Sequence, residues 1–188
     1  MNNPLRILQT LDRHLSTPAE MTIFGRAALA LGYPGSSSTF ATTQDVDAIL
    51  SLTRLDAEDQ NFDFWQAQQH TNTELEPEGL YVTHLFGELD IILQPDWLER
   101  RVPIHLELQR LAVFRPTTLD LILTKMARGD EQDLADIRFL LQQEKFTSDQ
   151  LRSGFQRARV PDVPEIRELF YNTQSKVLSL AGIECKGF

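Results

Sequence analysis

A short apolar run that stops at a glycine and continues into a helix-favouring stretch is the feature that most restricts how this chain can fold. Met21–Phe24 has the composition of a strand, Gly25 follows it, and Arg26–Leu31 is rich in alanine and leucine. This order of strand, glycine and helix is typical of a core that mixes α and β structure. A second strand is expected to begin near Asp45.

The remaining patterns predict further helices and one hairpin. Asn3-Pro4 predicts a helix start, with Asn3 as the N-cap. The alternating runs Leu80–Leu85 and Glu88–Leu93 flank Phe86-Gly87, an order that predicts a β-hairpin. Helices are expected at about residues 3–15, 59–73, 117–128 and 130–143 and in two later segments separated by Pro161 and Pro164, with a loop at 32–39 and extended chain at 102–114.

The predicted elements indicate an α+β fold. Its N-terminal part alternates helices with strands and in this respect resembles α/β folds. We expect a small mixed sheet flanked by helices and followed by a helical C-terminal region. The expected domains are residues 1–116, which hold the N-terminal helix and the sheet, and residues 117–188, which pack on that core as helices.

Composition narrows the setting in which the chain acts. The single cysteine, Cys185, cannot form an internal disulfide, and no apolar run approaches the roughly 18 residues that cross a bilayer. We therefore expect a cytoplasmic protein without a membrane partner.

The net charge of −9 argues against a broad basic surface for long nucleic acid. The segment Leu55–Gly79 carries seven acids and no lysine or arginine, which indicates a solvated face or an acidic docking surface.

Three aspartates carry the chemical argument. Asp45 and Asp47 are one residue apart in a predicted strand, so their side chains share a face with Cα atoms about 6.5 Å apart. Asp90 lies in another predicted strand, Leu89–Leu93. Three carboxylates that converge repel one another unless cations lie between them. Magnesium prefers oxygen ligands, and a pair of such ions is used in phosphoryl transfer.

The order of these motifs resembles the nucleotidyltransferase superfamily of DNA polymerase β. The matching blocks are the turn at Gly25, the Asp-x-Asp pair, the later strand aspartate, and a helical block that runs from Leu119 to Ile137. That last block, with its Lys-x-x-Arg and Asp-x-x-Asp spacings, is similar to bacterial abortive-infection and toxin-type nucleotidyltransferases. The resemblance covers about residues 20–142.

The resemblance implies a role for each matching residue. Asp45, Asp47 and Asp90 become the catalytic and Mg²⁺-binding residues, with Asp90 as the third ligand or as the base for an acceptor hydroxyl. The residues that it assigns to the nucleotide are Gly25, Arg26, Thr43, Lys125 and Arg128. For Lys125 and Arg128, an ordinary salt bridge to Asp133 or Asp136 is the alternative.

The resemblance also implies a reaction. The expected enzyme is a Mg²⁺-dependent nucleotidyltransferase that moves a nucleoside monophosphate from an NTP to a hydroxyl of RNA, a protein or a small molecule. The family favours a toxin–antitoxin or phage-defence setting with an antitoxin partner. Two departures from the family pattern, Arg26 in the turn and Ala41 where relatives carry a basic residue, favour the alternative of a catalytically degenerate module that binds a nucleotide or a protein. As a third hypothesis, the aspartates have a structural role and the chain is a plain interaction module.

Overall fold

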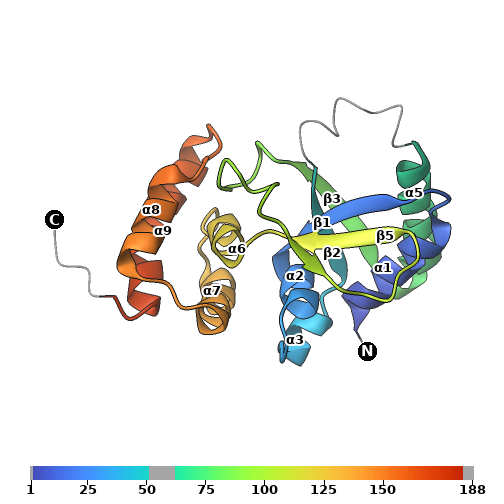
Figure 1. Ribbon diagram of the computed structural model, residues 1–188, viewed down its shortest axis with the longest axis horizontal. Helices are drawn as coiled ribbons and strands as arrows, with labels where there is room; N and C mark the ends of the chain where they lie inside the picture. Colours follow the sequence, from blue (N-terminus) through green and yellow to red (C-terminus); the bar gives the residue numbers. More distant parts are fainter. Residues whose placement is uncertain (1, 51–61, 184–188) are drawn as a thin grey trace. The chain divides into compact units, whose positions relative to one another are not determined.

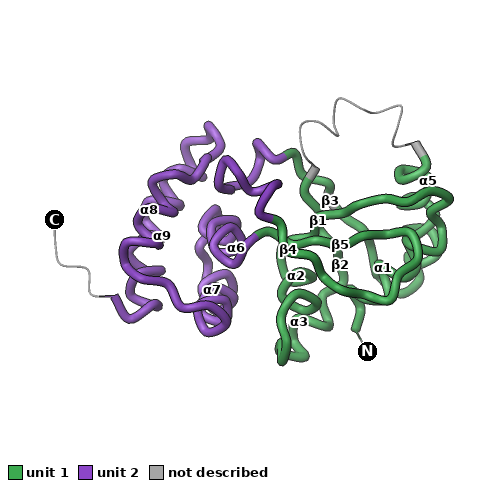
Figure 2. The backbone as a smooth tube through the Cα atoms, in the orientation of Figure 1, with its two compact units in different colours: residues 1–87, 101–116 green, residues 88–100, 117–188 purple. Residues whose placement is uncertain are grey.

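The computed structural model describes residues 2–50 and 62–183 (Figure 1). The chain divides into two compact units, drawn in different colours in Figure 2. The first comprises Met1–Gly87 and Arg101–Pro116, and the second comprises Glu88–Arg100 and Thr117–Phe188. The expected domains, 1–116 and 117–188, remain a prediction, because these units are defined by contacts and not by independent folding.

The first unit contains a five-stranded mixed sheet with the order β3-β2-β1-β5-β4. Central β1 pairs antiparallel with β2 and parallel with β5, β2 pairs parallel with β3, and β4 pairs antiparallel with β5. The strands are β1 Ala19–Phe24, β2 Asp45–Leu50, β3 Tyr81–Gly87, β4 Val102–Ile104 and β5 Leu111–Arg115. The predicted α+β class and the predicted strands at residues 21–24 and from Asp45 are confirmed.

Helices pack on this sheet through their apolar faces. The helices are α1 Asn3–His14, α2 Gly25–Gly32, α3 Ser38–Ala41 and α5 Phe62–Leu75, followed by the 3-10 turn η2 Glu76–Glu78. Helix α1 contacts α5, β2 and β5, and α2 contacts β1 and β2. Leu8 and Leu11 of α1 are fully buried. Hydrophobic burial of one helical face thus holds α1 to the sheet.

Three local predictions about these helices need comment. The N-cap of α1 is Asn2 and not Asn3, because the Asn2 side chain accepts the Leu5 N–H at 3.1 Å. The expected loop at 32–39 includes the start of α3 at Ser38. The expected start of α5 at residue 59 lies outside the described residues.

The predicted hairpin around Phe86-Gly87 is wrong. Strand β3 runs through both residues to Gly87, and its partner is β2. Residues 88–93 form turns and bends, with one isolated bridge between Leu93 and Arg159. Ile91, Ile92 and Leu93 are all buried, whereas a strand with one solvent-facing side would expose every second residue.

Residues 88–100 are held in the second unit by side-chain hydrogen bonds. Asp120 accepts the Gln94 N–H at 2.8 Å, and Glu88 accepts the Trp97 indole N–H at 2.6 Å. Burial raises the pKa of Asp120, although hydrogen bonds from Thr117 and Gln94 oppose the shift. The apolar run that had the appearance of a strand is therefore a loop fixed by long-range contacts.

The rest of the second unit is helical, as predicted. Thr117 caps α6 and Asp130 caps α7, each through its side chain. Pro164 is the first residue of the last helix, which agrees with the predicted break at Pro161 and Pro164. The helices are α6 Thr118–Lys125, α7 Glu131–Gln143, α8 Ser148–Arg157 and α9 Pro164–Leu180. Within the described ranges, none of the helices has both the length and the apolar character needed to span a bilayer.

Candidate functional site

Asp45 and Asp47 lie together on β2, as predicted. Val46 and Ala48 between and beside them are buried, whereas both aspartates are partly exposed. The alternation of a strand therefore places both carboxylates on the face opposite the core residues. Thr43, two residues before the first residue of β2, donates its hydroxyl to Asp45 Oδ1 at 2.7 Å. This bond orients one oxygen of the carboxylate.

Asp47 lies at an irregularity of the sheet. The pairing of β2 with β3 shifts its register between Val46 and Ala48, on either side of this aspartate. Thr83 of β3 donates its hydroxyl to Asp47 Oδ1 at 2.9 Å. Bulges of this kind often re-aim a side chain near a functional site. The position and the hydrogen bond together fix the direction of the Asp47 carboxylate.

Gly25 brings the turn before α2 against Asp47. Asp47 is the cross-strand partner of Phe24, the residue before the glycine. Gly25 has a φ of 61°, a left-handed conformation that favours glycine, and a Cβ added there would lie 3.3 Å from Asp47 Oδ2. The N-cap residue of α2, Phe24, makes no side-chain capping hydrogen bond. Because Phe24 offers no side-chain acceptor to the first N–H groups of α2, this helix start suits an anionic ligand.

Arg26 and Ala41 are the two departures from the family pattern. Arg26 follows Gly25 in α2, and Ala41 lies in α3, a helix that contacts α2. The Arg26 guanidinium carbon is 5.8 Å from the centre of the Phe40 ring. Phe40 and Ala41 belong to the short helix α3. The arginine is therefore held beside α3 by a cation–π contact.

Asp90 does not lie in a strand, and that part of the prediction is wrong. It is exposed in a bend of the second unit, whereas Asp45 and Asp47 belong to the first. Among the residues that the structure describes, no three His, Cys, Asp or Glu side chains group closely enough to hold a metal ion. Of the three aspartates expected to form the metal site, only Asp45 and Asp47 lie in the same unit.

Lys125 and Arg128 form ion pairs within the second unit. The Lys125 ammonium lies 3.2 Å from Asp133 Oδ1 and 2.7 Å from Asp136 Oδ2, and its side chain is 6% exposed. Arg128 Nε lies 2.9 Å from Asp133 Oδ2. The salt bridges to Asp133 and Asp136, which were the alternative to a nucleotide-binding role, are present. A contact of Lys125 or Arg128 with a nucleotide remains a prediction.

Thr83 is the functional candidate that the sequence did not single out. It alternates with Tyr81 on the outward side of β3, but only the pairing of β3 with β2 brings it to Asp47. The alternation was readable from residues 80–85. The strand pairing was not, because it joins segments that are far apart in the chain.

A mixed sheet with paired aspartates on one strand, beside a glycine turn that opens a helix, defines a protein of the nucleotidyltransferase type. Residues 5–153 match the family described as "Nucleotidyltransferase of unknown function (DUF6036)". The chain belongs to this family. No curated protein and no solved structure matches the chain. The matched residues include all the candidate site residues from Gly25 to Arg128.

Proposed function

We propose that this protein is a Mg²⁺-dependent nucleotidyltransferase that moves a nucleoside monophosphate from an NTP to a hydroxyl acceptor. The observation that carries the proposal is the position of Asp47. Its carboxylate lies 3.3 Å from where a Cβ on Gly25 would stand, so an acid of β2 adjoins the start of α2. An NTP needs a site for its phosphates and a site for its metal, and this arrangement offers both within a few ångströms.

The donor set at β2 fits magnesium. Asp45 and Asp47 are hard oxygen ligands on one strand face, and Thr43 and Thr83 orient one oxygen of each. Two protein carboxylates suffice for an ion that keeps several waters and shares the phosphates of its substrate. When bound, Mg²⁺ supplies positive charge that stabilises the phosphate oxygens.

The remaining residues bind and orient the reactants. Gly25 allows the backbone to approach the triphosphate, and the N–H groups at the start of α2 face its negative charge. The acceptor oxygen forms a bond to the α-phosphorus, the bond to the bridging oxygen breaks, and pyrophosphate leaves. The hydroxyl proton passes to a carboxylate, for which Asp90 is the candidate; as the alternative, Asp90 is the third metal ligand.

The test is transfer of label from a radioactive NTP by the full chain with magnesium, using Asp47→Ala as the variant. The wild-type chain transfers label, and the variant loses transfer by at least about a hundredfold, the scale on which an essential charged group acts. Equal labelling by the two proteins would remove Asp47 from the reaction. Circular dichroism checks that the variant keeps its fold.

A second candidate function is a catalytically degenerate module that binds a nucleotide or a protein without turnover. The observation in its favour is that cations assigned to the nucleotide have other contacts: Lys125 with Asp133 and Asp136, and Arg26 with Phe40. Calorimetry with each NTP and magnesium separates the two functions. Binding without release of pyrophosphate supports the degenerate module, and release supports the transferase.

The biological setting belongs to the same proposal. The resemblance to toxin-type relatives supports a cytoplasmic role in a toxin–antitoxin or phage-defence system, with an antitoxin as protein partner and RNA or protein among the acceptors. A small DNA-binding protein encoded beside this chain, and able to suppress its labelling activity, would support that setting. An activity that such a neighbour leaves unchanged would argue against it.

A further inference from the structure

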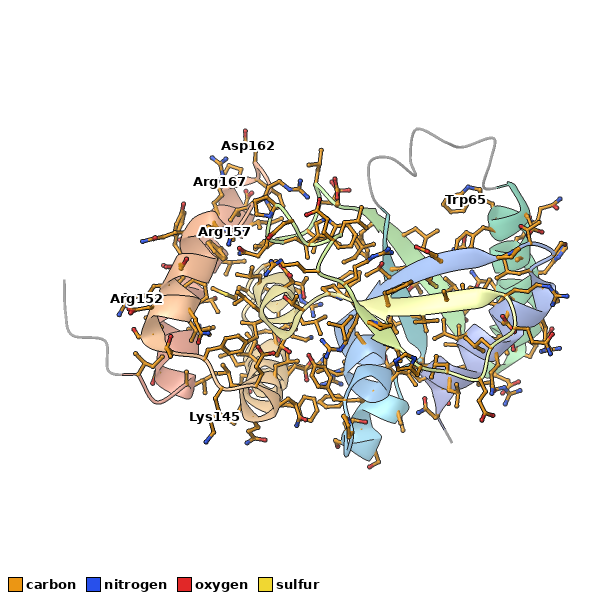
Figure 3. The ribbon with its side chains drawn as sticks, viewed as in Figure 1. Trp65, Lys145, Arg152, Arg157, Asp162 and Arg167 are labelled. Carbon is orange, nitrogen blue, oxygen red and sulfur yellow. The ribbon has the colours of Figure 1, made fainter. Side chains whose placement is uncertain are left out.

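A hollow of about 460 Å³ lies along α5 in the first unit. It is bounded on one side by the helix and on the other by Tyr81, the first residue of the edge strand β3. Trp65 projects from α5 near the start of the helix, as Figure 3 shows. The other residues that line the hollow are Gln68, Gln69, Asn72, Thr73 and Glu76. Its volume is within the range of small-molecule pockets.

The wall of this pocket is fixed by a contact between α5 and the edge of β3. Asn72 accepts the Val82 N–H at 2.8 Å and donates to the Val82 carbonyl at 2.9 Å. Gln68 donates to the same carbonyl at 3.3 Å. The side chain of Asn72 thus takes the place of a neighbouring strand at Val82. Because those backbone groups are used, an extended peptide cannot add to the sheet there.

Several polar groups of the pocket have no hydrogen-bond partner in the part of the chain that the structure describes. Among the described residues, no hydrogen bond is made by the Trp65 indole N–H, the Gln69 side-chain amide or the Tyr81 hydroxyl. Trp65 and Tyr81 are also large aromatic residues that are 37% and 36% exposed. Aromatic faces beside unused donors and acceptors suit a ligand with both apolar and hydroxyl surfaces.

The charge of the pocket is negative. Of the lining residues that the structure describes, Glu76 is the charged one, and its carboxylate has no ionic or hydrogen-bonding partner among the described residues. The neighbouring acids are matched, since Glu74 pairs with Arg13 and His14, and Glu78 pairs with Arg6. A phosphodiester chain would be repelled by Glu76, whereas a cation would be attracted both by Glu76 and by the aromatic rings.

The pocket adjoins the acid pair through the sheet. Tyr81 is the cross-strand partner of Asp45, and neighbouring strands lie about 4.8 Å apart. Two residues further along β3, Thr83 contacts Asp47. A molecule bound beside Tyr81 therefore lies next to the strand that carries both carboxylates.

We infer that this pocket is the acceptor subsite and that its acceptor is a small, hydroxyl-bearing organic cation such as an amino sugar. The inference rests on the proposed transferase function. A hydroxyl of the bound cation supplies the oxygen that joins the α-phosphorus of the NTP, pyrophosphate leaves, and the hydroxyl proton passes to a carboxylate. The Glu76 carboxylate binds the ammonium group and takes no part in bond making.

Binding to the full chain tests the inference separately from catalysis. The probes are the glucosamine trimer, maltotriose as the uncharged trisaccharide, and the RNA trinucleotide UUU, each titrated by calorimetry. The trimer is expected to bind at least about tenfold more tightly than maltotriose, because the ammonium groups meet Glu76 and the rings. Glu76→Gln and Trp65→Ala are each expected to raise the Kd of the trimer about tenfold, whereas Glu168→Gln, an exposed acid on α9, leaves it unchanged.

Three results would contradict the inference about the pocket. The inference is overturned if the trimer does not bind, if Glu76→Gln and Trp65→Ala bind it as wild type does, or if UUU binds more tightly than the trimer. Asp47→Asn distinguishes this failure from failure of the proposed function. That variant is expected to bind the trimer normally and to lose transfer of label to it. Wild-type protein that binds the trimer but transfers no label to it would refute the transferase function while leaving the pocket as the binding site of the cation, and transfer by the variant at the wild-type rate would remove Asp47 from the reaction.

Discussion

Asp12 accepts hydrogen bonds from three consecutive backbone N–H groups, those of Gln109, Arg110 and Leu111. The distances from Arg110 N and Leu111 N to Asp12 Oδ1 are 2.7 and 2.8 Å. Gln109 N lies 3.0 Å from Oδ2. Asp12 is 6% exposed, and it ties α1 to the segment that leads into β5. Burial by itself would raise the pKa of Asp12, but the three backbone hydrogen bonds outweigh it and hold the pKa below the ordinary value of 3.8.

We predict that Asp12→Asn lowers the free energy of unfolding by about 2 kcal/mol at neutral pH, since hydrogen bonds to a charged group are lost. A carboxylate with a lowered folded-state pKa stabilises the fold above its unfolded-state pKa and loses that effect as the pH falls through the folded value. The difference between wild type and variant should therefore be full above pH 3.8 and shrink at lower pH. Urea unfolding at several pH values measures it. The exposed Glu99→Gln serves as the control, and a difference that grows on acidification would contradict the prediction.

At the same scale, the sequence located some site residues and missed others for identifiable reasons. Asp45 and Asp47 were placed on one face because strand alternation is a local property. Thr83 was missed because its contact with Asp47 depends on strand pairing. Asp90 was misplaced because its apolar neighbourhood was interpreted as a strand, although that segment is fixed by distant side chains such as Asp120.

Among the elements, α6 and α7 enclose a buried cluster of charges. Lys125 lies between Asp133 and Asp136, whose side chains are each 1% exposed. Arg128 adds a second cation at Asp133, and its own side chain is 68% exposed. A buried ion pair contributes little net stability, but removal of one partner leaves an uncompensated charge in the interior.

We predict that Lys125→Met lowers the free energy of unfolding by about 3–5 kcal/mol, since two buried carboxylates lose their shared cation. Lys145→Met is the matched control, because Lys145 is exposed and labelled at the surface in Figure 3. Urea unfolding of both variants provides the measurement. Unchanged stability of Lys125→Met, together with a higher KM for the NTP, would instead identify Lys125 as a nucleotide contact.

The elements themselves were predicted where local signals define them. Helices α6 and α7 lie within the predicted ranges 117–128 and 130–143, and each begins after a residue whose side chain caps it, Thr117 and Asp130. The hairpin prediction failed because two alternating runs around a glycine do not reveal which strands pair. The loop that replaces its second strand depends on Asp120, which lies 26 residues after the Gln94 N–H that it accepts.

For the whole molecule, the chain path is less simple than the sequence suggested. The sheet and the helical region were expected as successive segments, but residues 88–100 belong to the second unit and the chain then returns to form β4 and β5. Such a return depends on contacts between distant residues, of which local composition carries no sign. The family match, in contrast, spans residues from both units.

The claim that joins these observations is that Asp45 and Asp47 hold a divalent cation beside the Gly25 turn and that a nucleotide shares this cation. Electron paramagnetic resonance of Mn²⁺, a stand-in for Mg²⁺, tests it directly on the full chain, with and without a non-hydrolysable NTP analogue. We predict that wild type binds Mn²⁺ more tightly when the analogue is present, and that the double variant Asp45→Asn/Asp47→Asn loses this analogue-dependent binding. Analogue-dependent binding of Mn²⁺ by the double variant with wild-type affinity would contradict the account.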